Sequence, residues 1–159
     1  MKISQEVRDF FQQQNFVIVS TIDSQGNIHS SAKGILEIQE DKLYLADAYR
    51  AVTFSNLKRN PKVTVTSIDE RHFKGFCIKG KASVIERGQL DQQTLTKWEE
   101  RLIQRISQRL IKNVQEEKIT SHHPEAKLPK LQYLIVIDFE QIVDLTPQHL
   151  KQGKKDGFK

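Results

Sequence analysis

The sequence predicts a mainly β domain, an antiparallel meander or barrel, with helices added to it. Three runs rich in β-branched and apolar residues follow one another through short polar turns: Phe16 to Ile22, Ile28 to Ile38, and a third that begins at Leu43. Tight turns join antiparallel strands, whereas parallel strands need long crossovers. From Gln89 to about Lys118, apolar residues instead recur every three or four positions, which predicts one long amphipathic helix.

The length of the chain indicates one domain, and its charge is moderately basic. The 159 residues are enough to bury a core, and we expect a single domain over residues 1–147 and a basic tail over residues 148–159. The formal net charge of +5 is spread along the chain and is a weak indication of an anionic partner. Neither a signal-peptide core nor a long apolar run is present, so we expect a cytoplasmic protein that does not enter a membrane.

The first elements carry clear boundary signals. Ser4 can cap a short amphipathic helix whose apolar positions are Val7, Phe10 and Phe11, and we expect this helix to plug one end of the sheet. Residues 23–27, Asp-Ser-Gln-Gly-Asn, have turn chemistry and predict a hairpin between the first two strands.

Two strands flank a short helix between Leu43 and Ser67. The bend that enters this helix, residues 47–53, contains Arg50 and Thr53. The first N–H groups of a helix are unpaired and partly positive, which suits a phosphate. The alternative is that Asp47 or Thr53 simply caps the helix and Arg50 is solvated.

The second strand is unusually small and polar over residues 29–34, His-Ser-Ser-Ala-Lys-Gly. Small side chains let a flat ligand approach the backbone closely. An edge strand with a wet face explains the same composition. The residues alone leave both interpretations open.

The remaining strands and the long helix have ordinary structural explanations. Phe73 to Ile85 alternates like a strand, with Cys77 as a small core or interface residue rather than a nucleophile. Trp98 on the long helix is expected to pack against the barrel. Leu131 to Asp138 is expected to be the last strand, with Phe139 to Leu145 continuing the sheet or forming a bend. Residues 121–125, Ser-His-His-Pro-Glu, lack chelating spacing and predict a polar loop, not a metal site.

Four short motifs occur in order between Val19 and Val84. They are Ser20-Thr21-Ile22-Asp23 with Gly26, then His29-Ser30-Ser31-Ala32-Lys33, then Val52-Thr53-Phe54-Ser55-Asn56-Leu57 with Asn60-Pro61, then Gly75-Phe76-Cys77-Ile78-Lys79-Gly80-Lys81-Ala82. Their order and spacing resemble the flavin-binding split barrel of the pyridoxamine 5'-phosphate oxidase-like superfamily. The resemblance covers somewhat under half of the chain, and its weight comes from the four motifs together.

The resemblance implies a six-stranded antiparallel split β-barrel of Greek-key type that forms a homodimer and binds flavin mononucleotide (FMN). A flavin-dependent oxidoreductase with a small-molecule redox substrate follows as the expected function, without an identifiable catalytic side chain, because the cofactor would carry the chemistry. A non-catalytic flavin, deazaflavin or haem binder on the same barrel is the alternative, so whether the protein is an enzyme stays open. A nucleic-acid module ranks last, since no strand face interleaves aromatic and basic residues.

The resemblance and the residue types together assign the cofactor's position. We expect the phosphate at the helix entered by Thr53 and the ring along the second strand and the end of the third. The expected cofactor-binding residues are Ser30, Ser31, Ala32, Lys33, Ala46, Asp47, Ala48, Arg50, Thr53 and Asn56.

This chain departs from the family pattern at several positions. Val52 stands where a basic residue commonly precedes the helix threonine, and the oxidase branch's arginine, lysine and glutamine fall on Ser31, Leu36 and Gly75. True pyridoxamine phosphate oxidation is therefore not expected. Arg50 or Lys33 is expected to replace the missing charge.

Overall fold

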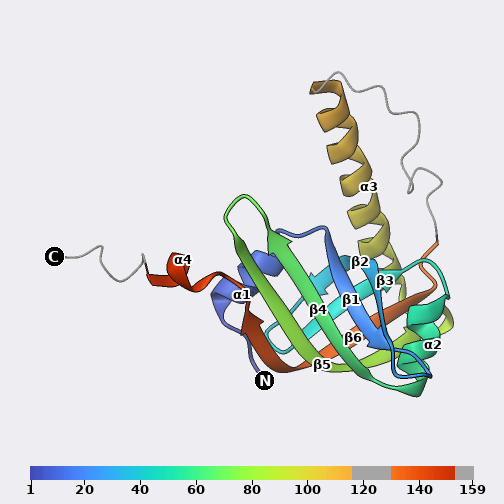
Figure 1. Cartoon of the computed structure of the whole chain (residues 1–159). Helices are drawn as coiled ribbons and strands as arrows, with labels where there is room; N and C mark the ends of the chain where they lie inside the picture. Colours follow the sequence, from blue (N-terminus) through green and yellow to red (C-terminus); the bar gives the residue numbers. More distant parts are fainter. Residues whose placement is uncertain (116–129, 153–159) are drawn as a thin grey trace.

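A computed structural model describes residues 1–115 and 130–152 and gives a closed six-stranded antiparallel barrel (Figure 1). The elements are α1 (Gln5–Gln12), β1 (Phe16–Ile22), β2 (Ile28–Ile38), β3 (Lys42–Asp47), α2 (Val52–Arg59), β4 (Lys62–Asp69), β5 (Lys74–Glu86), the 3-10 turn η1 (Arg87–Gln89), α3 (Gln92–Gln115), β6 (Tyr133–Asp144) and α4 (Gln148–Gln152). Around the barrel the strands run β1-β2-β3-β6-β5-β4. The predicted barrel and its two accessory helices are confirmed.

The barrel interior is filled by alternate residues of all six strands. On β1, Val17 and Val19 are buried, whereas Phe16 and Ile18, which alternate with them, face outward. Phe76 and Ile78 of β5 also lie in the core. Period-2 alternation therefore selects which apolar side chains form the core.

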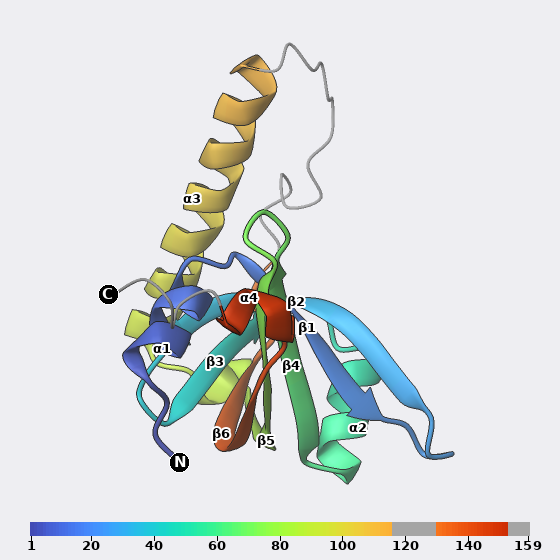
Figure 2. The ribbon, with the colours of Figure 1, turned by 60° about the vertical axis from the view of Figure 1, so that its left-hand side comes forward.

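Helices α1 and α2 close opposite ends of the barrel (Figures 1 and 2). At one end, the Ser4 hydroxyl accepts the Val7 N–H at 3.3 Å and caps α1, as predicted. The Phe10 ring of α1 meets the Phe76 ring edge-on, with centroids 5.1 Å apart. At the other end lies α2, which connects β3 to the non-adjacent β4.

Helix α3 packs on the outside of the barrel and continues beyond it (Figures 1 and 2). Trp98 and Leu102 are buried against Leu36, Ala46 and Leu134 of β2, β3 and β6, which confirms the expected packing of Trp98. The Arg105 guanidinium lies over both the Phe16 ring, at 5.0 Å, and the Trp98 ring, at 5.2 Å. This stacking attaches the middle of α3 to β1.

At the C-terminal end, residues 139–144 continue the sheet, which is one of the two alternatives that the sequence leaves open, and β6 runs as one strand from Tyr133 to Asp144. Gln148–Gln152 then form the short helix α4, which the sequence does not predict. The predicted loop at residues 121–125 lies outside the described residues. Within the described ranges, no helix has the length and apolar character needed to span a membrane.

Candidate functional site

The start of α2 has no side-chain cap. Its N-cap residue is Ala51, which cannot accept a hydrogen bond through its side chain, so neither Asp47 nor Thr53 caps this helix. Val52 at the first helical position is 47% exposed. No side chain therefore caps the N–H groups of the first turn, which give this end of the helix a partial positive charge that favours an anion, although Thr53 in the same turn is only 2% exposed.

Hydroxyl and amide groups fix this helix to the barrel. The Ser31 hydroxyl of β2 and the Thr53 hydroxyl of α2 lie 2.8 Å apart and share a hydrogen bond. The buried Asn56 amide donates to the Thr21 hydroxyl of β1 at 3.0 Å. These contacts hold the start of α2 against the ends of β1 and β2, beside the uncapped N–H groups.

A buried ionic group lies inside the same end of the barrel. The Lys33 ammonium of β2 pairs with the Asp47 carboxylate of β3, and these side chains are only 10% and 6% exposed. The Tyr133 hydroxyl of β6 donates to the same carboxylate oxygen at 2.5 Å. Burial, the hydrogen bond to Asp47 and its negative charge all raise the pKa of Tyr133, so this hydroxyl remains a donor at neutral pH.

The cation expected beside a phosphate is engaged with another residue. The Arg50 guanidinium pairs with the Glu86 carboxylate at 3.0 Å and lies over the Phe54 ring, and Lys58 does the same from the last turn of α2 at 3.2 Å. Both basic side chains are about half exposed. A partly exposed ion pair contributes only about 0–1 kcal/mol, so Arg50 can exchange Glu86 for a ligand phosphate.

Strand alternation divides the residues predicted to line a flavin ring. Ser30 and Ala32 are exposed on the outer side of β2, whereas Ser31 and Lys33 face the interior with their partners on α2 and β3. Ala46 is buried beneath α3, and Ala48 is half-buried in the bend. The structure thus groups Ser31 with Thr53 and Lys33 with Asp47, and it separates both pairs from Ser30 and Ala32.

Tyr133 and Glu86 contact residues of this candidate site, and the sequence does not identify them. Tyr133 lies 86 positions from Asp47 in the chain, and Glu86 is one of many charged residues at strand ends. Only the pairing of β3 with β6, and of β5 with β6, brings them to this end of the barrel.

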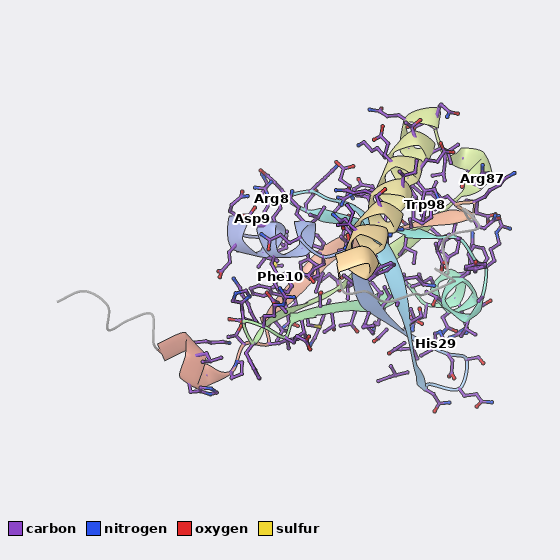
Figure 3. The ribbon with its side chains drawn as sticks, turned by 90° about the horizontal axis from the view of Figure 1, so that it is seen from above. Arg8, Asp9, Phe10, His29, Arg87 and Trp98 are labelled. Carbon is purple, nitrogen blue, oxygen red and sulfur yellow. The ribbon has the colours of Figure 1, made fainter. Side chains whose placement is uncertain are left out.

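A second polar region, at the α1 end of the barrel, has among its described residues no buried ion pair like the one above. A cavity of about 950 Å³ lies between α1, α4 and the β4–β5 turn and includes Asp9 and Phe10, which Figure 3 shows on α1, far from His29 of β2. Its charged walls are paired internally, for example Lys74 with Glu6 at 2.8 Å. In the part of the chain that the structure describes, no group of three or more His, Cys, Asp or Glu side chains is placed to hold a metal.

Comparisons with known proteins agree with this architecture. Among solved structures, HupZ from Group A Streptococcus superposes with a TM-score of 0.64 at 17% identity, covering 91% of this chain and 94% of that chain. An F420 reductase superposes with a TM-score of 0.57 at 13% identity, covering 89% and 98%. HutZ, the heme storage protein from Vibrio cholerae, has a TM-score of 0.52 at 18% identity, covering 90% and 94%. At such identities the likeness concerns the fold alone.

Sequence comparison is more specific. No curated protein matches this sequence. The family model described as pyridoxamine 5'-phosphate oxidase, however, matches residues 3–143, which is nearly the whole barrel. The chain therefore belongs to the pyridoxamine 5'-phosphate oxidase family.

Proposed function

We propose that this protein binds FMN, with the phosphate at the start of α2, and uses it in redox chemistry on a small molecule. The observation that carries the proposal is the uncapped helix start beside the paired hydroxyls of Ser31 and Thr53. N–H groups of a helix start and neutral hydroxyls are suitable phosphate donors. Arg50 would supply the positive charge by leaving Glu86.

The ring would lie on the outer side of β2, across the strand from Ser31, where the side chains are small. Ser30 and Ala32, exposed on β2, leave room for a flat ring near the backbone. The flavin would supply electron or hydride transfer when bound, and this chain's residues would hold and orient it. The buried Lys33–Asp47–Tyr133 group would keep β2, β3 and β6 rigid behind that surface.

The substrate is expected to differ from pyridoxamine phosphate. Leu36, where the oxidase branch has lysine, is buried under α3 and offers no charge. A Cβ atom on Gly75, where that branch has glutamine, would lie 3.0 Å from the Ser67 carbonyl oxygen. Both positions are therefore built for packing.

The absorbance spectrum of the purified protein tests the cofactor class. A two-banded flavin spectrum supports the proposal, whereas a single strong Soret band indicates haem and a single near-violet band indicates a deazaflavin. The last two outcomes would assign the alternative function. They have a structural precedent, because the F420 reductase and HutZ share the fold.

The first prediction concerns the position of the phosphate. Val52→Lys places an ammonium at the exposed first position of α2, and we expect it to strengthen FMN binding by about ten- to a hundredfold, the value of one charge-assisted contact of about 1.5–3 kcal/mol. Riboflavin, which lacks the phosphate, should gain little. Titration of both ligands, followed by flavin fluorescence, measures the ratio.

Ile103→Lys, at an exposed position of α3, is the matched control for an added lysine. It should leave both affinities unchanged. If Val52→Lys folds normally and the FMN to riboflavin affinity ratio stays as in the wild type, the phosphate does not bind at α2.

A further inference from the structure

The outer wall of the barrel contains a groove where two strands separate. β1 and β4 pair over only three positions, from Ile18 and Thr66 to Ser20 and Thr64. β1 nevertheless continues to Ile22, and β4 begins at Lys62. Figure 2 shows the β1–β2 hairpin bending away from β4 in this region. The ladder therefore ends early and leaves a hollow between the two strand ends.

This hollow has the size of a ligand site. It encloses about 440 Å³, within the range of roughly 300–1,000 Å³ typical of small-molecule pockets. Its far wall is β5, whose pairing with β6 has a bulge between Lys79 and Gly80. At Gly80 a Cβ atom would lie 2.1 Å from the Asp138 carbonyl oxygen, so no side chain fits there. Bulges of this kind often lie beside binding sites.

The groove carries excess positive charge. Lys62, Lys79 and Glu140 line it, and within the described residues neither of the two ammonium groups has an ion-pair partner. Lys81, directly opposite Lys62 in the β4–β5 ladder, pairs with Glu140 at 3.3 Å. Because Lys81 already compensates the charge of Glu140, the ammonium groups of Lys62 and Lys79 are left to attract an anion.

The other walls supply hydroxyl groups and apolar surface. Ser20 and Thr64 are directly opposite in the β1–β4 ladder, and Thr64 is opposite Lys79 in the next ladder. Ile22 and Ile28 pair at the start of the hairpin, and Ile28 is 77% exposed. Ammonium and hydroxyl groups thus border an apolar surface that no other part of the described chain covers.

We propose that this groove binds a phosphate monoester with a compact apolar body. A phosphate monoester carries about −1.5 to −2 charges at neutral pH, which matches the two unpaired ammonium groups of Lys62 and Lys79. Its apolar part would lie against Ile22 and Ile28. The groove shares no lining residue with the phosphate site proposed at Ser31, Arg50 and Thr53, although the Ser20 hydroxyl in its wall is hydrogen-bonded to Ser30 at 2.9 Å. The two sites are therefore neighbours with separate phosphate positions.

Three probes separate the contributions to binding: phenyl phosphate, phenol and inorganic phosphate. In amide NMR spectra of the full-length chain, phenyl phosphate should shift the signals of residues 20–22, 62–64 and 79–80. Phenol and inorganic phosphate should each bind there at least about tenfold more weakly, because each supplies only half of the recognised groups. Equal binding of inorganic phosphate, or phenyl phosphate shifts confined to residues 50–54, would overturn the proposal.

Matched double variants test the charges. Lys62→Gln with Lys79→Gln should weaken phenyl phosphate binding by about tenfold or more, since two charge-assisted contacts are lost. Lys2→Gln with Lys97→Gln removes the same net charge at distant exposed sites and should change binding by less than about twofold. The proposal is wrong if both double variants weaken binding equally, because the effect would then be one of overall charge.

Discussion

At the scale of single residues, the polar interior of the barrel is the least expected feature. Burying the Lys33–Asp47 pair costs desolvation free energy, which is offset only if the remaining hydrogen-bonding capacity is used. Tyr133 supplies such a bond from β6. The three strands that carry these residues are thereby linked by a single polar contact group inside an apolar core.

Tyr133→Phe tests the value of that bond. We expect the free energy of unfolding at pH 7 to fall by about 1.5–3 kcal/mol, because a hydrogen bond to a buried carboxylate is lost without a replacement. Urea unfolding measures the change. Tyr44→Phe, on the outward side of β3, is the control and should cost less than about 0.5 kcal/mol.

Tyr133 should also make the stability of the protein depend on pH in alkaline solution. The pKa of Tyr133 is raised in the folded state, so the unfolded chain loses this proton first, near pH 10. Its contribution to stability is complete below pH 10 and declines as the pH rises above that value. The wild type should therefore lose stability more steeply than Tyr133→Phe in alkaline solution. Parallel curves for the two proteins would contradict this account.

Residue types indicated Lys33 and Asp47 as site residues, but not their bond to one another. Sequence position does not show which distant residue completes a polar pair, and Tyr133 and Glu86 are joined to the site only by strand pairing. The charge of Arg50 likewise suits a phosphate, whereas its ion pair with Glu86 depends on where β5 ends. Residue roles at this site therefore need the tertiary structure.

Among the secondary-structure elements, the regular strands can be predicted from local sequence signals. The predicted strands Phe16 to Ile22 and Ile28 to Ile38 have the same bounds in the structure. Apolar alternation and turn residues determine these bounds locally. The irregular features were not predicted: the bulge in β5, the early end of the β1–β4 ladder and the helix α4 depend on neighbouring strands or on weak local preferences.

Gly80→Ala tests whether the β5 bulge requires glycine. The added Cβ would lie 2.1 Å from the Asp138 carbonyl oxygen, a contact that only a backbone shift can relieve. We expect a loss of about 3 kcal/mol or more in the free energy of unfolding, as for severe overpacking. Thermal and urea denaturation measure it.

Gly88→Ala provides the matched control, because a Cβ at that position meets nothing within 4 Å. This variant should unfold like the wild type to within about 0.5 kcal/mol. If both alanine variants are equally stable, the bulge relaxes freely, and Gly80 is not required for the β5–β6 pairing.

At the scale of the whole molecule, four weak motifs in the correct order predicted the family, which the match over residues 3–143 confirms. The substrate and the cofactor cannot be predicted from the sequence in the same way. Their identity depends on a few exposed groups, and this chain departs from the family pattern at one of them, Val52. A fold is specified by many residues jointly, whereas ligand choice rests on a few.

The homodimer expected from the sequence has a candidate surface on the outer face of β1. The barrel is closed, so no open edge needs a partner, and Phe76 and Ile78 face inward. Ile18, however, points outward and is 47% exposed, whereas the Phe16 ring on the same face is partly covered by Arg105. Ser20 and Ile22 of the groove follow on this face, so the interface would border the groove. Exposed apolar side chains grouped on one strand face favour association through a symmetric interface.

We predict that the wild-type chain sediments as a dimer at micromolar concentration and that Ile18→Lys weakens the dimer by at least about tenfold, because a charge would have to be buried in the apolar contact. Ile111→Lys makes the same change on α3, where the isoleucine side chain is 58% exposed, and should leave the dimer intact. Sedimentation velocity over a concentration series distinguishes these outcomes. A wild-type monomer at these concentrations would refute the dimer, whereas a dimer that Ile18→Lys leaves unchanged would mean that association uses a surface other than β1.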